Sequence, residues 1–184
     1  MIKAIISDFD GTLVDTVEAN YHAYQYVFKE VVNIELNKDF YVKNFGLRID
    51  DICKQLNIED QNIIKNIKNL KAQVYPNFFN YLKLNKDLLN TFNYFKNQGL
   101  TIALASTAAS KNLNNVLNYF KISNTFDLII SGDDVKKGKP NPEVYNVALD
   151  KLGINNDEAL VFEDSEAGIE AAKQANIKFI KITI

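Results

Sequence analysis

The chain has 184 residues, of which 47% are hydrophobic and 24% charged, a balance typical of a globular protein with a sizeable core. The formal net charge is −2 and no basic block occurs, so the sequence argues against nucleic-acid binding. The sequence has one cysteine, and it shows no apolar run of membrane-spanning length and no signal-peptide pattern. We therefore expect a cytoplasmic protein that does not bind membranes.

Five short apolar runs, each bounded by turn residues, predict strands that are buried on both faces. The last four runs alternate with helical patterns at 110–120, 142–152 and 165–175. Alternating strands and helices predict a parallel sheet covered by helices. The five predicted strands are 3–7, 100–106, 126–131, 159–162 and 177–182.

The segment between the first two predicted strands is helical in pattern. Helices are expected at 16–32, 38–45, 49–56 and 60–74, followed by a return segment at 76–84 and a crossover helix at 85–98. We therefore predict an α/β fold, a Rossmann-like three-layer core with a parallel sheet. The core comprises residues 1–15 and 83–184, and residues 16–82 form an inserted helical bundle.

Residues suited to phosphate and metal chemistry follow the predicted strands. Two carboxylates at spacing two end the first strand, and burying them is costly unless they bind something. The carboxyl ends of parallel strands meet at one edge of a sheet, where ligands bind. The sequence thus predicts that Asp8, Ser106 and Asp164, with Lys139 just ahead of a helix, reach one site. Asp10 and Glu163 are the neighbouring acids in the motifs of Asp8 and Asp164.

In their order along the chain, these motifs resemble those of the haloacid dehalogenase superfamily of phosphohydrolases. The first motif reads Asp8-Phe9-Asp10-Gly11-Thr12. The stretch 132–172, with Lys-Pro-x-Pro and Glu-Asp-Ser-x-Ala-Gly, resembles the branch that holds phosphoglycolate-type phosphatases and β-phosphoglucomutase. The resemblance covers nearly the whole chain and implies that the helical bundle is a cap that opens for substrate and closes against water.

Chemistry and resemblance together suggest roles for the acidic residues. Asp8 is expected to be the nucleophile that forms an aspartyl-phosphate. Asp10 is expected to protonate the leaving oxygen and then to deprotonate water. Mg²⁺ prefers oxygen ligands, which Asp8 and Asp164 provide. By the resemblance, Asp10 adds its backbone carbonyl, and Glu163 binds the metal directly or through water.

The remaining predicted site residues handle phosphate. Lys139 is expected to offset negative charge around Asp8, and Ser106 to hydrogen-bond phosphoryl oxygens, with Thr107 as a further possible contact. Arg48, the only arginine, follows Gly46-Leu47 as basic residues do in related caps. It is expected either to bind a distal phosphate or carboxylate of the substrate, or to form a surface ion pair with Asp50 or Asp51.

Three further residues receive structural interpretations. Gly11 is expected to adopt a positive φ, and Thr12 to hydrogen-bond within its loop. His22 lies in an amphipathic helix and is interpreted as a structural or surface residue, with catalysis as the lesser alternative. Cys53 is expected to be a buried apolar residue.

The main functional hypothesis is a Mg²⁺-dependent phosphatase, a monomer or weak dimer, acting on a small phosphorylated metabolite. The alternative is a phosphosugar mutase, although the histidine of the Glu-x-His sequence of β-phosphoglucomutase relatives is replaced here by Asn20. A non-catalytic binding module is the third hypothesis. Relatives usually continue beyond the last predicted strand. We therefore expect that the lack of these terminal elements affects stability or oligomerisation.

Overall fold

The computed structural model describes residues 1–183. The chain divides into two compact units, which we call the sheet unit (Met1–Asp15 with Lys83–Ile184) and the helical unit (Thr16–Leu82). Within the described part of the chain, no helix has the length and apolar character needed to cross a membrane.

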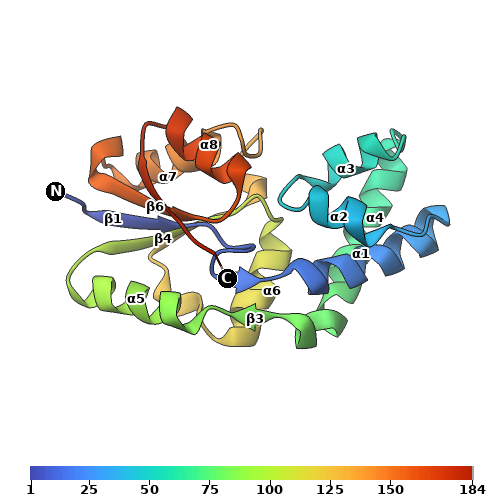
Figure 1. Cartoon of the computed structure of the whole chain (residues 1–184), viewed down its shortest axis with the longest axis horizontal. Helices are drawn as coiled ribbons and strands as arrows, with labels where there is room; N and C mark the ends of the chain where they lie inside the picture. The colour runs from blue at the N-terminus through green and yellow to red at the C-terminus, as the bar shows by residue number, and fades with distance from the viewer. Residues whose placement is uncertain (184) are drawn as a thin grey trace. The chain divides into compact units, whose positions relative to one another are not determined.

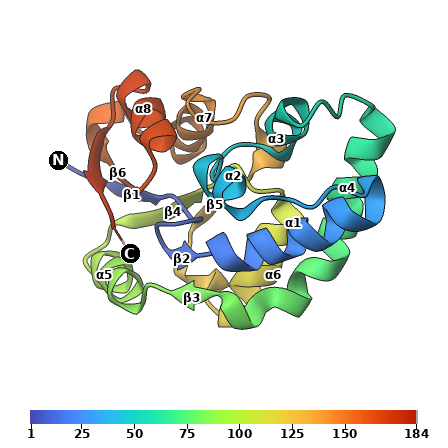
Figure 2. The same ribbon diagram turned by 45° about the vertical axis from the view of Figure 1, so that its right-hand side comes forward.

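The sheet unit is built on five parallel strands in the order β5-β4-β1-β6-β7. Helices α5 and α6 lie on one face of this sheet and α7 and α8 on the other (Figure 1 and Figure 2). The predicted α/β fold class is therefore confirmed. The strands are β1 (Ala4–Ser7), β4 (Thr101–Ala105), β5 (Leu128–Ile130), β6 (Ala159–Glu163) and β7 (Lys178–Lys181), and the helices are α5 (Lys86–Asn97), α6 (Ser110–Phe120), α7 (Glu143–Leu152) and α8 (Glu166–Gln174).

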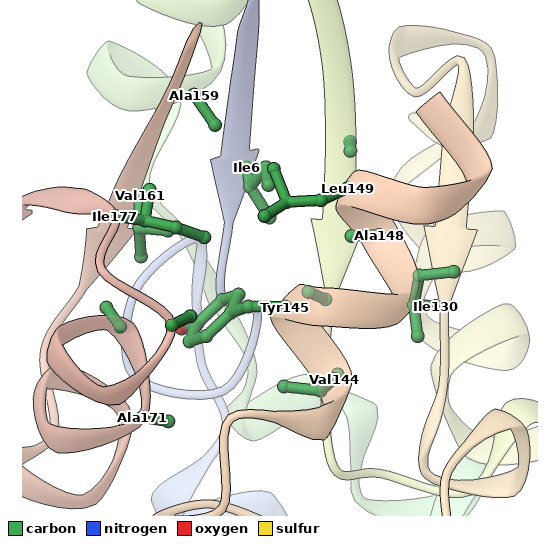
Figure 3. Close-up of a cluster of buried hydrophobic side chains, with 14 of the residues drawn as sticks. Ile6, Ile130, Val144, Tyr145, Ala148, Leu149, Ala159, Val161, Ala171 and Ile177 are labelled. Atoms are coloured by element: carbon green, nitrogen blue, oxygen red, sulfur yellow. The ribbon is translucent and has the colours of Figure 1, made fainter. Parts of the chain in front are cut away.

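Buried apolar side chains hold α7 and α8 on the sheet. Ile6 of β1 and Val161 of β6 are completely buried in a cluster that also contains Tyr145 and Ala148 of α7 (Figure 3). Burying a large apolar side chain contributes roughly 1.5–3 kcal/mol. This packing fixes the central strands, and hence the position of the residues that follow them.

A two-stranded antiparallel ribbon was not predicted from the sequence. Strand β2 (Val14–Asp15) pairs with β3 (Lys83–Leu84), so the chain leaves and re-enters the sheet unit at the same place. Each strand has only two residues, which is too short for a visible alternation of apolar and polar positions.

The helical unit contains the predicted helices, with slightly shorter bounds. They are α1 (Val17–Val32), α2 (Lys38–Lys43), α3 (Ile49–Gln55) and α4 (Gln61–Val74). The predicted return segment is largely a 3-10 helix, η1 (Tyr75–Tyr81). Cys53 is completely buried in the core of this unit, and burial raises the pKa of its thiol to about 11, which confirms its interpretation as an apolar residue.

Side-chain caps explain several helix starts. Asn85 accepts a hydrogen bond from the backbone N–H of Leu88 at the start of α5, and Ser165 accepts one from Gly168 at the start of α8. Three shorter 3-10 helices, η2 (Ser123–Thr125), η3 (Gly132–Asp134) and η4 (Asn156–Glu158), occur in connections of the sheet unit. The cap at Ser165 fixes the backbone directly after the acidic pair that ends β6.

Candidate functional site

The predicted acidic residues meet at the carboxyl ends of two neighbouring strands. Asp8 directly follows β1, and Glu163 is the last residue of the adjacent β6. The backbone N–H of Asp8 donates to the carbonyl oxygen of Phe162 at 2.9 Å, which extends the strand pairing to the site. Both carboxylates are buried, Glu163 completely, so they require partners that offset their charge.

Lys139 is the cation that pairs with these buried carboxylates. Its Nζ lies 2.6 Å from Asp8 Oδ1 and 2.6 Å from Glu163 Oε1, and it also donates to the carbonyl oxygen of Ala105 at 3.2 Å. Burial disfavours the charge on Lys139, but Asp8 and Glu163 outweigh it and hold the pKa of the ammonium well above its usual value. Lys139 therefore stays protonated against the side chain of Asp8.

Glu163 is held by hydrogen bonds at both carboxylate oxygens. Besides Lys139, its Oε1 accepts a hydrogen bond from the Tyr145 hydroxyl at 3.2 Å. Its Oε2 accepts from the backbone N–H of Ser165 at 2.9 Å and from the Ser165 hydroxyl at 3.0 Å. These bonds fix the orientation of Glu163 toward Lys139.

Gly168 leaves the space that the Glu163 carboxylate occupies. A Cβ atom at this position of α8 would collide with the Glu163 carboxylate. Alanine normally stabilises a helix relative to glycine. Here, by contrast, Gly168→Ala is expected to lower the free energy of unfolding by about 1–3 kcal/mol, because the added methyl group overpacks the core.

Denaturant unfolding measures this effect. The matched control is Glu170→Ala, at an exposed position of the same helix, which is expected to leave stability nearly unchanged. A Gly168→Ala protein as stable as the wild type would show that Glu163 does not need this space.

Asp164 is held by the loop that carries the first motif. The Thr12 hydroxyl donates to Asp164 Oδ1 at 2.8 Å, a contact between residues 152 positions apart. Thr12 was expected to hydrogen-bond within its own loop, but its hydroxyl bonds to a carboxylate distant in the sequence instead. Gly11 has a φ of +92°, which confirms the predicted positive φ, and a Cβ there would collide with the Asp164 carboxylate.

Three carboxylates form a cluster compatible with a divalent metal ion. Ligand atoms of Asp8, Glu163 and Asp164 all lie within 4.8 Å of one another. Burial raises the pKa of Asp8 well above its usual value, Lys139 only partly offsets this, and the neighbouring carboxylates raise it further. Burial also raises the pKa of Asp164. A cation would relieve this repulsion, and oxygen donors are those that Mg²⁺ and Ca²⁺ prefer.

Asp10 and Ser106 lie together beside this cluster. The Ser106 hydroxyl donates to Asp10 Oδ2 at 3.3 Å and accepts from the backbone N–H of Ala108 at 3.0 Å. Ser106 directly follows β4, the other neighbour of β1. Thr107 is partly exposed in the same loop. Gly132, which follows β5, lies so close that a Cβ atom there would collide with the carbonyl oxygen of Thr107. The loop of Ser106 is therefore closely packed.

Two residues considered for the site belong to the helical unit. Arg48 directly precedes α3, and its predicted contact with substrate stays a prediction. Asp50, one of its two possible ion-pair partners, pairs with Lys68 at 2.8 Å. His22 lies on α1 with its ring centroid 4.5 Å from that of Tyr81 and its Nε2 3.7 Å from Glu18 Oε2, which agrees with a structural role.

Three supporting residues were not assigned their contacts from the sequence. Thr12 was expected to act within its loop, Ser165 only to cap a helix, and Tyr145 was not singled out. Tyr145 occupies a core-facing position of α7, so nothing in the pattern separates it from an ordinary packing residue. The sequence signal that could have indicated these contacts is the nearness of Ser165 and Thr12 to acidic motifs.

The chain is similar to known proteins over almost its whole length. Residues 5–182 match the family of haloacid dehalogenase-like hydrolases. The chain is 31% identical to a phosphorylated carbohydrates phosphatase of Thermotoga maritima, over 97% of this chain and 84% of that protein. It is 26% identical to the β-phosphoglucomutase of Bacillus subtilis, over 96% of this chain and 81% of that protein. The crystal structure of CbbY from Rhodobacter sphaeroides in complex with phosphate has a TM-score of 0.89 and 26% identity, covering 100% of this chain and 87% of CbbY.

Proposed function

Because the chain belongs to the haloacid dehalogenase-like hydrolases and is a phosphoric monoester hydrolase, we propose that it is a Mg²⁺-dependent phosphatase. Its substrate is a small phosphorylated metabolite, which it hydrolyses through an aspartyl-phosphate on Asp8. The observation that carries this proposal is the contact of Lys139 Nζ with Asp8 Oδ1 at 2.6 Å, next to Asp10 and Asp164. That arrangement gives a buried carboxylate nucleophile a fixed cation on one side and an acid–base residue nearby.

In the first step, an Asp8 oxygen attacks phosphorus and the ester oxygen leaves. Asp10, in its protonated form, gives its proton to this leaving oxygen. Its hydrogen bond with Ser106 supports the required placement beside Asp8. In the second step, Asp10 takes a proton from water, which attacks the phosphorus of the aspartyl-phosphate and releases phosphate and free Asp8.

Lys139 and Ser106 stabilise charge during both steps. Lys139 is held in place by Glu163 before substrate arrives, so its charge needs no rearrangement during the reaction. When phosphate is bound, the single O–H of Ser106, which donates to Asp10 in the structure, would donate to a phosphoryl oxygen instead, with Thr107 of the same loop as a further donor. The phosphate-bound relative CbbY supports a phosphate site in this fold.

Asp8, Asp164 and the backbone carbonyl of Asp10 would hold the Mg²⁺ ion. The ion supplies positive charge that lets a carboxylate approach a phosphate dianion. The cluster within 4.8 Å and the raised pKa values of Asp8 and Asp164 support this assignment. Glu163 is close enough to join the ligand set, but its oxygens already accept bonds from Lys139, Tyr145 and Ser165. We therefore propose that Glu163 acts mainly on Lys139.

Removal of the metal is expected to abolish turnover. Activity should vanish in chelator and return with Mg²⁺ but not with Ca²⁺, because Ca²⁺ takes a looser geometry. Asp164→Ala is expected to raise the Mg²⁺ concentration for half-maximal activity at least about tenfold. The control is Glu166→Ala, which removes a nearby carboxylate whose side chain is 83% exposed. Full activity in chelator would contradict the metal requirement.

The helical unit, residues 16–82, is proposed to act as a cap over the active site. Its opening would admit substrate and its closure would exclude bulk water. Arg48 is proposed to contact an anionic group of the substrate away from the reacting phosphate. This places substrate selection in the helical unit and the reaction in the sheet unit.

A phosphosugar mutase is the second candidate function, supported by the similarity to β-phosphoglucomutase. The test is a screen of the purified chain with Mg²⁺ against phosphorylated sugars, glycolate phosphate and other small phosphoesters. Free phosphate and isomerised sugar phosphate are measured in the same reactions. We expect free phosphate as the main product for at least one substrate, whereas Asp8→Asn protein gives none. Release of phosphate from no phosphoester would refute the proposed function.

A further inference from the structure

Tyr145 is a core tyrosine that hydrogen-bonds to a carboxylate of the site. It lies on α7 with its side chain completely buried, and it points into the core cluster that contains Ile6 and Val161 (Figure 3). Its hydroxyl lies 3.2 Å from Glu163 Oε1, the oxygen that also accepts from Lys139. Its ring centroid lies 5.0 Å from Lys139 Nζ. Tyr145 therefore touches both members of the ion pair that approaches Asp8.

A phenylalanine at this position would fill the core equally well, so packing does not explain the hydroxyl. The ring fills the core, while a buried phenol costs free energy unless its O–H has a partner. Burial raises the pKa of Tyr145, so the phenol stays neutral and its O–H donates a hydrogen bond to Glu163. A hydrogen bond from a neutral donor to a carboxylate is stronger than one between neutral groups.

This contact restricts how Glu163 can move. With Ser165 bonded to Oε2 and Tyr145 to Oε1, neither carboxylate oxygen can turn away without losing a bond. Oε1 is thereby kept at 2.6 Å from Lys139 Nζ, and Nζ is kept at 2.6 Å from Asp8 Oδ1. The order of contacts runs from Tyr145 through Glu163 and Lys139 to the carboxylate that would attack phosphorus.

We propose that Tyr145 is a positioning residue, whose hydroxyl holds Glu163 and through it sets Lys139 against Asp8. The inference rests on the proposed phosphatase function. It concerns the reaction step and not substrate binding, because Tyr145 is completely buried. Loss of the hydroxyl should consequently lower kcat and leave KM nearly unchanged.

The test compares Tyr145→Phe with Tyr94→Phe, which removes the same atom from an exposed tyrosine of α5. We expect kcat of Tyr145→Phe to fall roughly five- to tenfold with KM within about twofold, and both constants of Tyr94→Phe to match the wild type. Kinetics are measured well below the melting temperature of each variant. Unchanged kcat in Tyr145→Phe would overturn the proposal. A fall in kcat that the fraction of unfolded protein fully explains would also overturn it.

Crystal structures of the wild type and Tyr145→Phe give a readout that needs no activity. We expect the variant to show Glu163 Oε1 displaced from Lys139, or Lys139 Nζ moved away from Asp8. Contacts unchanged from the wild-type crystal structure would overturn the positioning role. If the wild type releases no phosphate from any substrate, the proposed function fails, and this structural comparison still decides the role of Tyr145.

Discussion

Replacing Asp8 with asparagine is expected to lower turnover more than roughly a thousandfold, because an amide is a poor nucleophile and a poor metal ligand. The fold should persist. The amide oxygen of asparagine can still accept the bond that Lys139 now donates to Asp8 Oδ1 at 2.6 Å. The steady-state rate of phosphate release, with circular dichroism and a thermal melt for the fold, measures this prediction.

Asp157→Asn makes the same chemical change at an exposed position and should keep full activity. Mass spectrometry of the Asp8→Asn protein excludes deamidation back to aspartate. Substantial turnover by a confirmed Asp8→Asn protein would contradict an aspartyl-phosphate on Asp8, although it would leave the family assignment untouched.

Lys139→Met is expected to abolish activity and to destabilise the sheet unit by about 3–5 kcal/mol when unfolding is measured in chelator. Methionine fills similar volume, so the cost arises from charge. The variant leaves Asp8 and Glu163, which both bond to Nζ at 2.6 Å in the wild type, without their buried cation.

The control for Lys139→Met is Lys137→Met, two residues earlier, at an exposed position. Only the backbone N–H of Lys137 bonds to Glu143, and this bond survives the substitution. We expect little change in stability or activity. Equal stability of the two variants would show that Lys139 is not needed to compensate the buried carboxylates.

The family and the parallel sheet could be predicted because both depend on features local in the sequence. Asp8 and Glu163 stand at the ends of apolar runs, and parallel strands bring such ends together whatever the details of packing. The family predicted from the ordered motifs is confirmed by the match over residues 5–182. The five strands and the main helices are also confirmed, with ends that differ by a few residues.

The supporting contacts depend on side-chain directions that no local pattern encodes. Thr12 reaches Asp164 across 152 positions, and Tyr145 reaches Glu163 from a helix on one face of the sheet. The ribbon of β2 and β3 joins residues distant in sequence through strands too short to show a pattern. These features follow from the packed fold, so the sequence predicts candidate reactive groups but not the residues that hold them.

We propose that water, and not a sugar hydroxyl, receives the phosphoryl group from Asp8. The most direct measurement follows radiolabelled phosphate from a hexose phosphate that the chain turns over. We predict that the label appears mainly as inorganic phosphate, that no bisphosphate sugar is needed as activator, and that Asp8→Asn protein yields no labelled product. Label transferred mainly to a different carbon of the sugar would contradict hydrolysis of the aspartyl-phosphate and establish a mutase.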